Sequence, residues 1–251
     1  MQIIETSSLT ETQIDEIARL TKACCTYDKI RLTYPYDESG DTCRHYLLYE
    51  ADGSLSACLA MLPLDGGAAE CSAFTHPACR RQGYFSRLLK SAMERYDDYD
   101  ILFGVPESCR AALEVLSALG AEPEAREHQM ELVLPKSPSI PACHAGLTLI
   151  SSRKTAPPAT EWTLLKDNIP VGRCLITPVS GACACLHHLE IEKPFRQKGY
   201  GSSFLALLLP RIAAAGIRKI ILQVSGHNPA AMALYQKTGF RITETLSFFC
   251  Y

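Results

Sequence analysis

The feature that most constrains the fold is a short basic segment that occurs twice. Residues 80–84 (Arg-Arg-Gln-Gly-Tyr) recur 116 positions later as residues 196–200 (Arg-Gln-Lys-Gly-Tyr). A second landmark, the glycine before the last strand of each half, recurs with nearly the same spacing, from Gly120 to Gly239. Two copies at a domain-sized spacing indicate a duplicated domain and not a solenoid of short repeats.

The boundary between the copies is expected at residues 135–146, where prolines, serines and a glycine interrupt the hydrophobic periodicity. We therefore expect domains at 1–136 and 146–251.

Both halves show the same order of expected elements, β-β-β-α-β-α-β, and the first has an additional helix in front. In the first half these are a helix at 8–25, strands at 46–50, 55–62 and 69–75, a helix at 83–96, a strand at 101–105, a helix at 110–119 and a strand at 129–134. In the second they are strands at 163–166, 171–177 and 183–191, a helix at 199–215, a strand at 217–225, a helix from Asn228 to Gly239 and a strand at 240–251. This order predicts an α/β fold with a mixed sheet flanked by helices in each domain.

Composition excludes several classes of function. The net charge is −2 and offers no broad cationic surface, so nucleic acid is not expected as a partner. No apolar run approaches the roughly 20 residues of a membrane helix, and the N-terminus lacks a signal peptide pattern. We expect a cytoplasmic protein with no membrane segment.

The 12 cysteines occur mostly singly in apolar stretches, and no Cys-x-x-Cys is present. They are expected to be small buried thiols. The run Cys183, Cys185, His187 and His188 suggests zinc as an alternative, but adjacent strand residues point to opposite faces and a second, distant ligand pair is missing. We therefore expect no metal site.

The segment that most clearly indicates chemistry follows the expected strand at 183–191. A glycine-containing loop that opens a helix presents free backbone N–H groups and the positive end of the helix dipole, which suit a phosphate group. Gly199 and Gly201 are expected to let the ligand approach the backbone, and Arg196 and Lys198 add positive charge. The patterns of dinucleotide-binding folds and P-loops are absent.

This loop and a second motif resemble the GNAT family of acyl-CoA-dependent N-acyltransferases. The family's pyrophosphate loop, Arg/Gln-x-x-Gly-x-Gly/Ala, is matched by Arg196, Gly199 and Gly201. A later family motif is matched about thirty residues further on by Asn228, Ala231, Leu234, Tyr235, Gly239 and Phe240. The resemblance is strong in the second half and weak in the first, and it implies two tandem GNAT-like domains.

The resemblance implies that acetyl-CoA is the co-substrate of the second half. Backbone groups around Leu189 and Ile191 would hold the acyl carbonyl and the pantetheine arm, loop amides would cradle the pyrophosphate, and Asn228 would bind the pantetheine arm while it caps its helix. The full set of expected binding residues is Leu189, Ile191, Arg196, Gln197, Lys198, Gly199, Tyr200, Gly201, Ser202 and Asn228.

The resemblance also implies the catalytic groups. Tyr235 would be the general acid for the departing thiolate, since a phenol with a pKa near 10 is protonated at neutral pH. His187 lies nine residues before Arg196, where related enzymes carry a strand histidine, and it is the first candidate for the general base. Glu190 is the second candidate, and a proton relay through water is the third.

The first half departs from the family pattern. Its loop has Phe85 where the second half has a small residue, and this side chain either crowds the phosphates or turns into the core. Cys109 and Leu116 stand where the second half has asparagine and tyrosine. We expect the first half to have lost transfer chemistry.

The resulting prediction is an N-acetyltransferase that moves the acetyl group to a primary amine by direct attack in a ternary complex. A CoA-binding sensor or scaffold without transfer is the alternative. The acceptor, a small-molecule or a peptide amine, carries no signature in the sequence, and a monomer and a homodimer both remain open.

Overall fold

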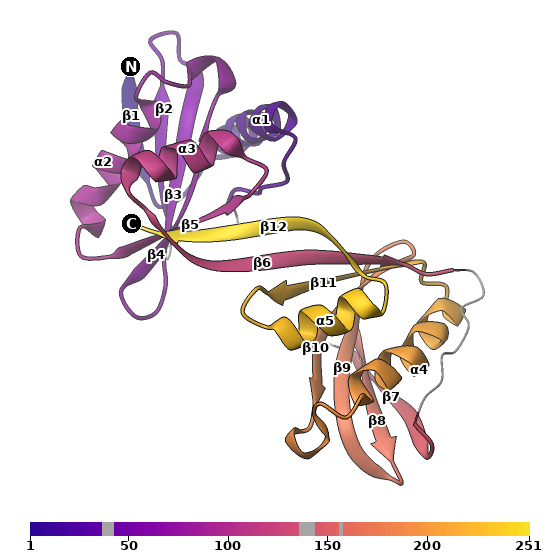
Figure 1. Ribbon diagram of the computed structural model, residues 1–251. Coiled ribbons are helices and arrows are strands. Elements are labelled where there is room, and N and C mark those ends of the chain that lie inside the picture. Colours follow the sequence, from indigo (N-terminus) through magenta and orange to yellow (C-terminus); the bar gives the residue numbers. More distant parts are fainter. Residues whose placement is uncertain (37–42, 136–143, 156–157) are drawn as a thin grey trace. The chain divides into compact units, whose positions relative to one another are not determined.

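The chain forms two compact units, shown in a computed structural model that describes residues 1–36, 43–135, 144–155 and 158–251 (Figure 1). Unit 1 comprises Met1–Ala125 together with Leu246–Tyr251, and unit 2 comprises Arg126–Thr245. Each unit is a mixed, mostly antiparallel sheet flanked by helices, which confirms the predicted fold class.

Unit 1 has the sheet order β1-β2-β3-β4-β5-β12, in which only the β4–β5 pair is parallel. Its elements are β1 (Gln2–Thr6), α1 (Glu11–Asp28), β2 (Arg44–Tyr49), β3 (Leu55–Pro63), β4 (Ala68–Thr75), the 3₁₀ turn η1 (Pro77–Cys79), α2 (Tyr84–Tyr96), β5 (Asp100–Pro106), α3 (Arg110–Leu119) and the end of β12 (Arg241–Cys250).

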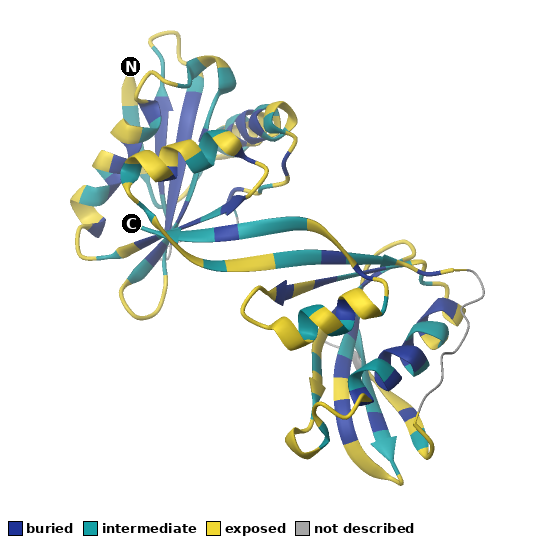
Figure 2. Cartoon of the chain, in the orientation of Figure 1, coloured by how far each residue is buried: buried dark blue, intermediate teal, exposed yellow. Residues whose placement is uncertain are grey.

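Helices cover both faces of the unit 1 sheet, because alternate residues of β3 belong to different cores. Leu59 and Met61 pack with α2 and α3, whereas Cys58 and Ala60 pack with α1. A capping box opens α1: the Thr10 side chain accepts a hydrogen bond from the backbone N–H of Gln13, and the Gln13 side chain accepts one from the backbone N–H of Thr10. Figure 2 shows the buried central strands between partly exposed helices.

Unit 2 has the sheet order β12-β6-β11-β10-β9-β8-β7, with the first half of β12 at one edge and β10–β11 as a parallel pair. Its elements are β6 (Glu122–Val133) from Arg126 on, β7 (Leu147–Thr155), β8 (Pro158–Lys166), β9 (Ile169–Ser180), β10 (Cys183–Ile191), the 3₁₀ turn η2 (Lys193–Phe195), α4 (Tyr200–Ala214), β11 (Lys219–Ser225), α5 (Pro229–Lys237) and the first half of β12.

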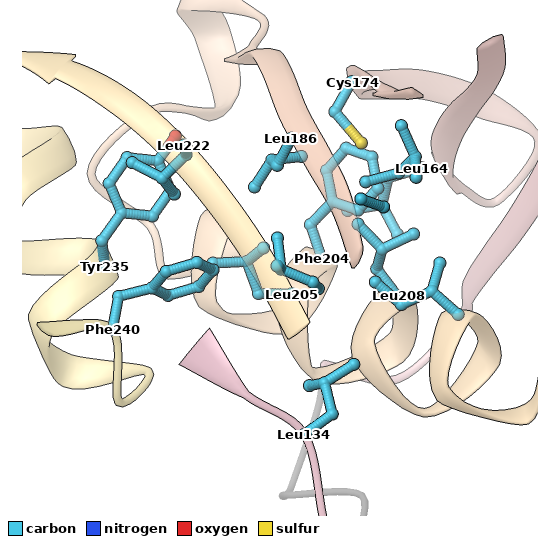
Figure 3. Close-up of a cluster of buried hydrophobic side chains, with 14 of the residues drawn as sticks. Leu134, Leu164, Cys174, Leu186, Phe204, Leu205, Leu208, Leu222, Tyr235 and Phe240 are labelled. Atoms are coloured by element: carbon cyan, nitrogen blue, oxygen red, sulfur yellow. The ribbon is translucent and has the colours of Figure 1, made fainter. Parts of the chain in front are cut away.

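A single buried cluster forms the core of unit 2 among its described residues, and it gathers side chains from the strands, α4 and α5 (Figure 3). Phe204, Leu205 and Leu208 are the inward residues of α4, as its periodicity predicts. The described part of unit 2 contains no counterpart of α1.

The last strand of each half completes the sheet of the other unit. β6 follows α3 in sequence, yet its residues from Glu127 to Val133 pair with β11 of unit 2. Conversely, the end of β12 pairs with β5 of unit 1, from Leu246 opposite Pro106 to Cys250 opposite Leu102. The compact units therefore differ from the expected domains 1–136 and 146–251, because a strand's backbone can pair with any free strand edge and its sequence does not state which.

The helices agree with the sequence analysis to within a few residues, whereas two strands were missed. β1 is short, and β7 lies next to the expected linker, where its alternation was not recognised. Most of that linker, residues 136–143, lies outside the described residues.

Candidate functional site

The central strands of unit 2 part at the middle of the sheet. β10 and β11 pair only from Cys183 to Cys185, opposite Lys219 to Ile221. Beyond Cys185, β10 continues to Ile191 and is bonded only to β9. The parting strands are parallel, and their carboxyl ends are where α/β folds commonly bind ligands. Leu189 and Ile191 lie on this unpaired stretch, where the sequence analysis expected the strand to separate from its neighbour.

A β-bulge lies on the same stretch. His187 is opposite Leu175 and Glu190 is opposite Arg173, so β10 has one residue more than β9 between these pairs. His188 takes a positive φ of 50° to accommodate it. A bulge leaves an extra residue outside the ladder, which frees backbone groups for a ligand. The corresponding strand of unit 1, β4, pairs with β3 without a register shift.

The loop after β10 has the backbone of an anion site. Gln197 and Gly199 have positive φ values of 60° and 84°, and α4 begins directly afterwards at Tyr200. No side chain of the described residues caps this helix at Gly199, so its first N–H groups point to the space in front of the helix. The loop of unit 1 has the same conformation, with positive φ at Arg81 and Gly83.

The two glycines of the loop leave room for side chains of the protein itself. A Cβ at Gly201 would lie 3.0 Å from Cδ2 of Leu234 on α5. A Cβ at Gly199 would lie 3.0 Å from Cε1 of His144. Gly201 thus permits close packing of α4 on α5, and Gly199 is required by its positive φ as well.

The predicted cations of the loop are held by nearby acceptors. Arg196 donates from Nε to the carbonyl oxygen of Ile191 at 2.7 Å and from a terminal nitrogen to Glu190 at 3.2 Å. Lys198 donates to the carbonyl oxygen of Pro194 at 2.8 Å. These bonds fix the loop to the end of β10. Ser202 lies in the first turn of α4 and is half-buried.

The two candidate bases differ in their surroundings. The His187 side chain is exposed, and its Nδ1 lies 3.8 Å from Sγ of Cys185 on the same face of β10. Glu190 is bound to two arginines, Arg196 and, at 3.4 Å, Arg173. The carboxylate of Glu190 is paired with two cations, whereas the His187 ring is in no ion pair with any described residue. His187 is therefore the better placed of the two candidates to accept a proton.

Asn228 and Tyr235 lie at opposite ends of α5. The Asn228 side chain accepts a hydrogen bond from the N–H of Ala231 at 3.0 Å, which is the predicted N-cap. Tyr235 is 7% exposed and its ring lies 5.5 Å from that of Phe240 (Figure 3). Burial raises the pKa of Tyr235 to about 12, so the hydroxyl stays protonated and can donate.

Two residues beside the loop were not identified from the sequence. The His144 ring stacks on Tyr200 at 4.8 Å, and its Nδ1 lies 2.8 Å from the Ser203 hydroxyl. The Nζ of Lys166, the last residue of β8, lies 5.6 Å from the centre of the Tyr200 ring. Neither belongs to a motif, and the sequence carries no signal that would have found them.

The same region of unit 1 lacks the chemical groups of unit 2. Arg80 binds the Asp28 carboxylate through two hydrogen bonds, of 2.8 and 2.6 Å, so an internal carboxylate occupies this arginine. Phe85 turns into the core and lies 6.3 Å from Phe103, which decides between the two expected orientations. Leu116 is buried where unit 2 has Tyr235, and Cys109 makes no side-chain cap.

Within the described ranges, no three histidine, cysteine, aspartate or glutamate side chains gather in a way that could hold a metal ion. Cys24, Cys43, Cys58, Cys71, Cys109 and Cys174 are buried thiols. No helix in the described part of the chain is long and apolar enough to cross a membrane.

Comparison with known families identifies both halves of the chain. Residues 14–120 and 128–240 each match the model of the acetyltransferase (GNAT) family. The chain belongs to the GNAT family. This confirms the resemblance seen in the sequence, the tandem arrangement, and an acyltransferase at the level of the family.

The relatives agree with this assignment. The uncharacterised N-acetyltransferase YycN of Bacillus subtilis is 38% identical over 63 residues, which are 25% of this chain and 40% of that protein. A GCN5-related N-acetyltransferase from Sphaerobacter thermophilus has a TM-score of 0.76 at 17% identity over 99% of this chain and 95% of its own. A tandem GNAT protein from the clavulanic acid biosynthesis pathway has a TM-score of 0.72 at 14% identity over 100% and 98%. At these identities, the two structures establish a shared fold.

Proposed function

We propose that unit 2 binds acetyl-CoA and transfers its acetyl group to a primary amine by direct attack in a ternary complex. The observation that carries the proposal is the combination of parted strands, bulge and phosphate-type loop on one stretch of unit 2, from Cys185 to Tyr200. Unit 1 has the parted strands and the loop but neither the bulge nor a tyrosine at the position of Tyr235.

Acetyl-CoA supplies an acetyl group activated as a thioester. Free amides at the bulge around Leu189 suit the developing charge on a carbonyl oxygen, since preorganised donors act most strongly where charge appears during the reaction. The amides from Gln197 to Gly201 suit the pyrophosphate. The side-chain NH2 group of Asn228, whose Oδ1 caps α5, suits the pantetheine arm.

The two proton transfers require a base and an acid. His187 accepts a proton from the ammonium group of the acceptor, directly or through water, and the free amine then attacks the thioester carbonyl, since an imidazole is a common general base. The Tyr235 hydroxyl donates a proton to the departing thiolate. Positioning of amine and thioester supplies much of the rate enhancement.

The acceptor is an amine of a small molecule or a peptide. A cytoplasmic location belongs to the same proposal, and the free thiols among the described cysteines are consistent with a reducing compartment. The alternative, a sensor that binds CoA without transfer, is less favoured because unit 2 retains Tyr235.

The test measures release of free thiol from acetyl-CoA across a panel of primary amines. The duplication offers a matched pair of variants, Gly199→Glu in unit 2 and Gly83→Glu in unit 1, since both glycines have similar positive φ values. We expect amine-dependent turnover that is lost in Gly199→Glu, kept in Gly83→Glu, and lowered about 10- to 100-fold in Tyr235→Phe. Turnover lost only in Gly83→Glu would contradict the assignment to unit 2, and CoA binding without turnover for any amine would favour the sensor.

A further inference from the structure

In each unit, the helix after the loop begins with a tyrosine. The charged residue that contacts this tyrosine is a cation in unit 2 and an anion in unit 1. In unit 2, Tyr200 contacts Lys166, whose Nζ lies 5.6 Å from the ring centre. In unit 1, the hydrogen bond to the Glu50 carboxylate raises the pKa of Tyr84, which is the counterpart of Tyr200. The same location beside this tyrosine therefore carries a cation in one unit and an anion in the other.

Lys166 and Glu50 occupy equivalent places in the fold. Lys166 is the last residue of β8 and pairs with Ile169 across the turn to β9. Glu50 follows β2 directly, and its N–H donates to the carbonyl oxygen of Ser54 across the turn to β3. The charge difference is therefore a difference in residue type at one structural position.

The other charged side chains near the unit 2 loop are engaged by different partners, so they do not duplicate the contact of Lys166 with Tyr200. Arg196 and Lys198 are engaged by acceptors of the loop and of β10. His144, from a different segment, stacks on the Tyr200 ring and also lies next to Gly199. Asp167, next to Lys166 in sequence, faces Gly146.

In unit 1 the charges oppose anion binding. Arg80 is neutralised by Asp28 at 2.6 Å, with both side chains mostly buried. Arg81 is exposed and lies 4.0 Å from Glu114. With Glu50 beside Tyr84, the loop of unit 1 has the backbone for a phosphate but lacks the cation that unit 2 carries beside Tyr200.

We propose that Lys166 is a specificity-determining residue that makes the loop of unit 2, and not that of unit 1, favour the anionic phosphates of CoA. The inference rests on the proposed function. Tyr200 is the first residue of α4, and a positive charge beside its side chain adds to the positive field of the helix N-terminus and raises the local concentration of an anionic ligand. The cation–π contact between the Lys166 ammonium and the Tyr200 ring keeps the charge at a defined place beside the first residue of α4.

The test is the dissociation constant of CoA measured by calorimetry for the full-length chain. Lys166→Glu copies the charge of unit 1, Lys166→Met removes the charge but keeps an unbranched side chain, and Lys90→Glu makes the same change of net charge at an exposed position on α2. We expect CoA to bind about tenfold more weakly to Lys166→Glu, less so to Lys166→Met, and unchanged to Lys90→Glu. The differences should shrink at ~1 M salt, where screening is strong.

An unchanged thermal midpoint in both Lys166 variants ensures that binding and not folding is measured. Binding to Lys166→Glu as tight as to the wild type would overturn this inference and leave the proposed function intact. A wild type that binds no CoA would overturn the proposed function itself.

Discussion

At the residue scale, Tyr235 joins a buried ring to a hydroxyl that stays protonated. Burial raises its pKa from the ordinary 10.0 to about 12, with the Cys174 thiol as a smaller contribution. Because the folded state binds this proton more tightly than the unfolded state, the associated stability is fully present below pH 10 and is lost as the pH rises towards 12.

The Tyr235→Phe variant removes this titration. We expect the free energy of unfolding of the wild type to fall between pH 9 and pH 11 by about 1 kcal/mol more than that of Tyr235→Phe. Urea unfolding followed by the fluorescence of Trp162, the single tryptophan, reports on unit 2. Equal losses in the two proteins would show that Tyr235 titrates normally in the folded state.

At the element scale, the bulge of β10 depends on a glycine in the neighbouring strand. A Cβ at Gly172 would lie 2.8 Å from the carbonyl oxygen of Glu190 and 2.7 Å from Cδ1 of Ile191. In unit 1, where the pairing has no bulge, Ala57 occupies the same place opposite the last residue of β4. The bulge therefore moves β10 into space that an alanine would need.

We expect Gly172→Ala to destabilise unit 2 by about 1–3 kcal/mol and to weaken CoA binding, because a backbone carbonyl must shift. Gly104→Ala is the matched control, since the three atoms nearest to its Cβ would all be side-chain atoms, with Phe248 the nearest at 3.1 Å, and a side chain can move more easily than a backbone. Chemical unfolding and CoA titration measure both effects. Full binding in Gly172→Ala would mean that the bulge can be displaced without consequence.

At the scale of the whole molecule, the exchange of terminal strands makes unit 1 dependent on the last residues of the chain. Removal of Leu246–Tyr251 exposes the edge of β5 and leaves Phe103 and Val105 without β12. We expect this truncation to lower the unfolding midpoint of unit 1, seen by far-UV circular dichroism, while the Trp162 transition of unit 2 changes little. A truncation that lowers only the Trp162 transition would contradict the exchange.

The sequence by itself determined the duplication, the helices, the GNAT resemblance and the loop from Arg196 to Gly201, because these depend on local signals. Helical periodicity, the Asn228 cap and the glycines with positive φ act over a few residues, and they hold whatever surrounds them. The close approach of Leu234 to Gly201 is not such a local signal, because the two residues are distant in sequence.

Only the tertiary structure decided which sheet β6 and β12 join. It also decided that Arg80 pairs with the Asp28 carboxylate, and that Lys166 and Glu50 lie at equivalent positions in the two units. These are contacts between segments far apart in the chain. A strand offers the same backbone donors and acceptors to any partner, and a charge acquires its function from the groups it faces. Spatial proximity, which no local pattern encodes, therefore determined them.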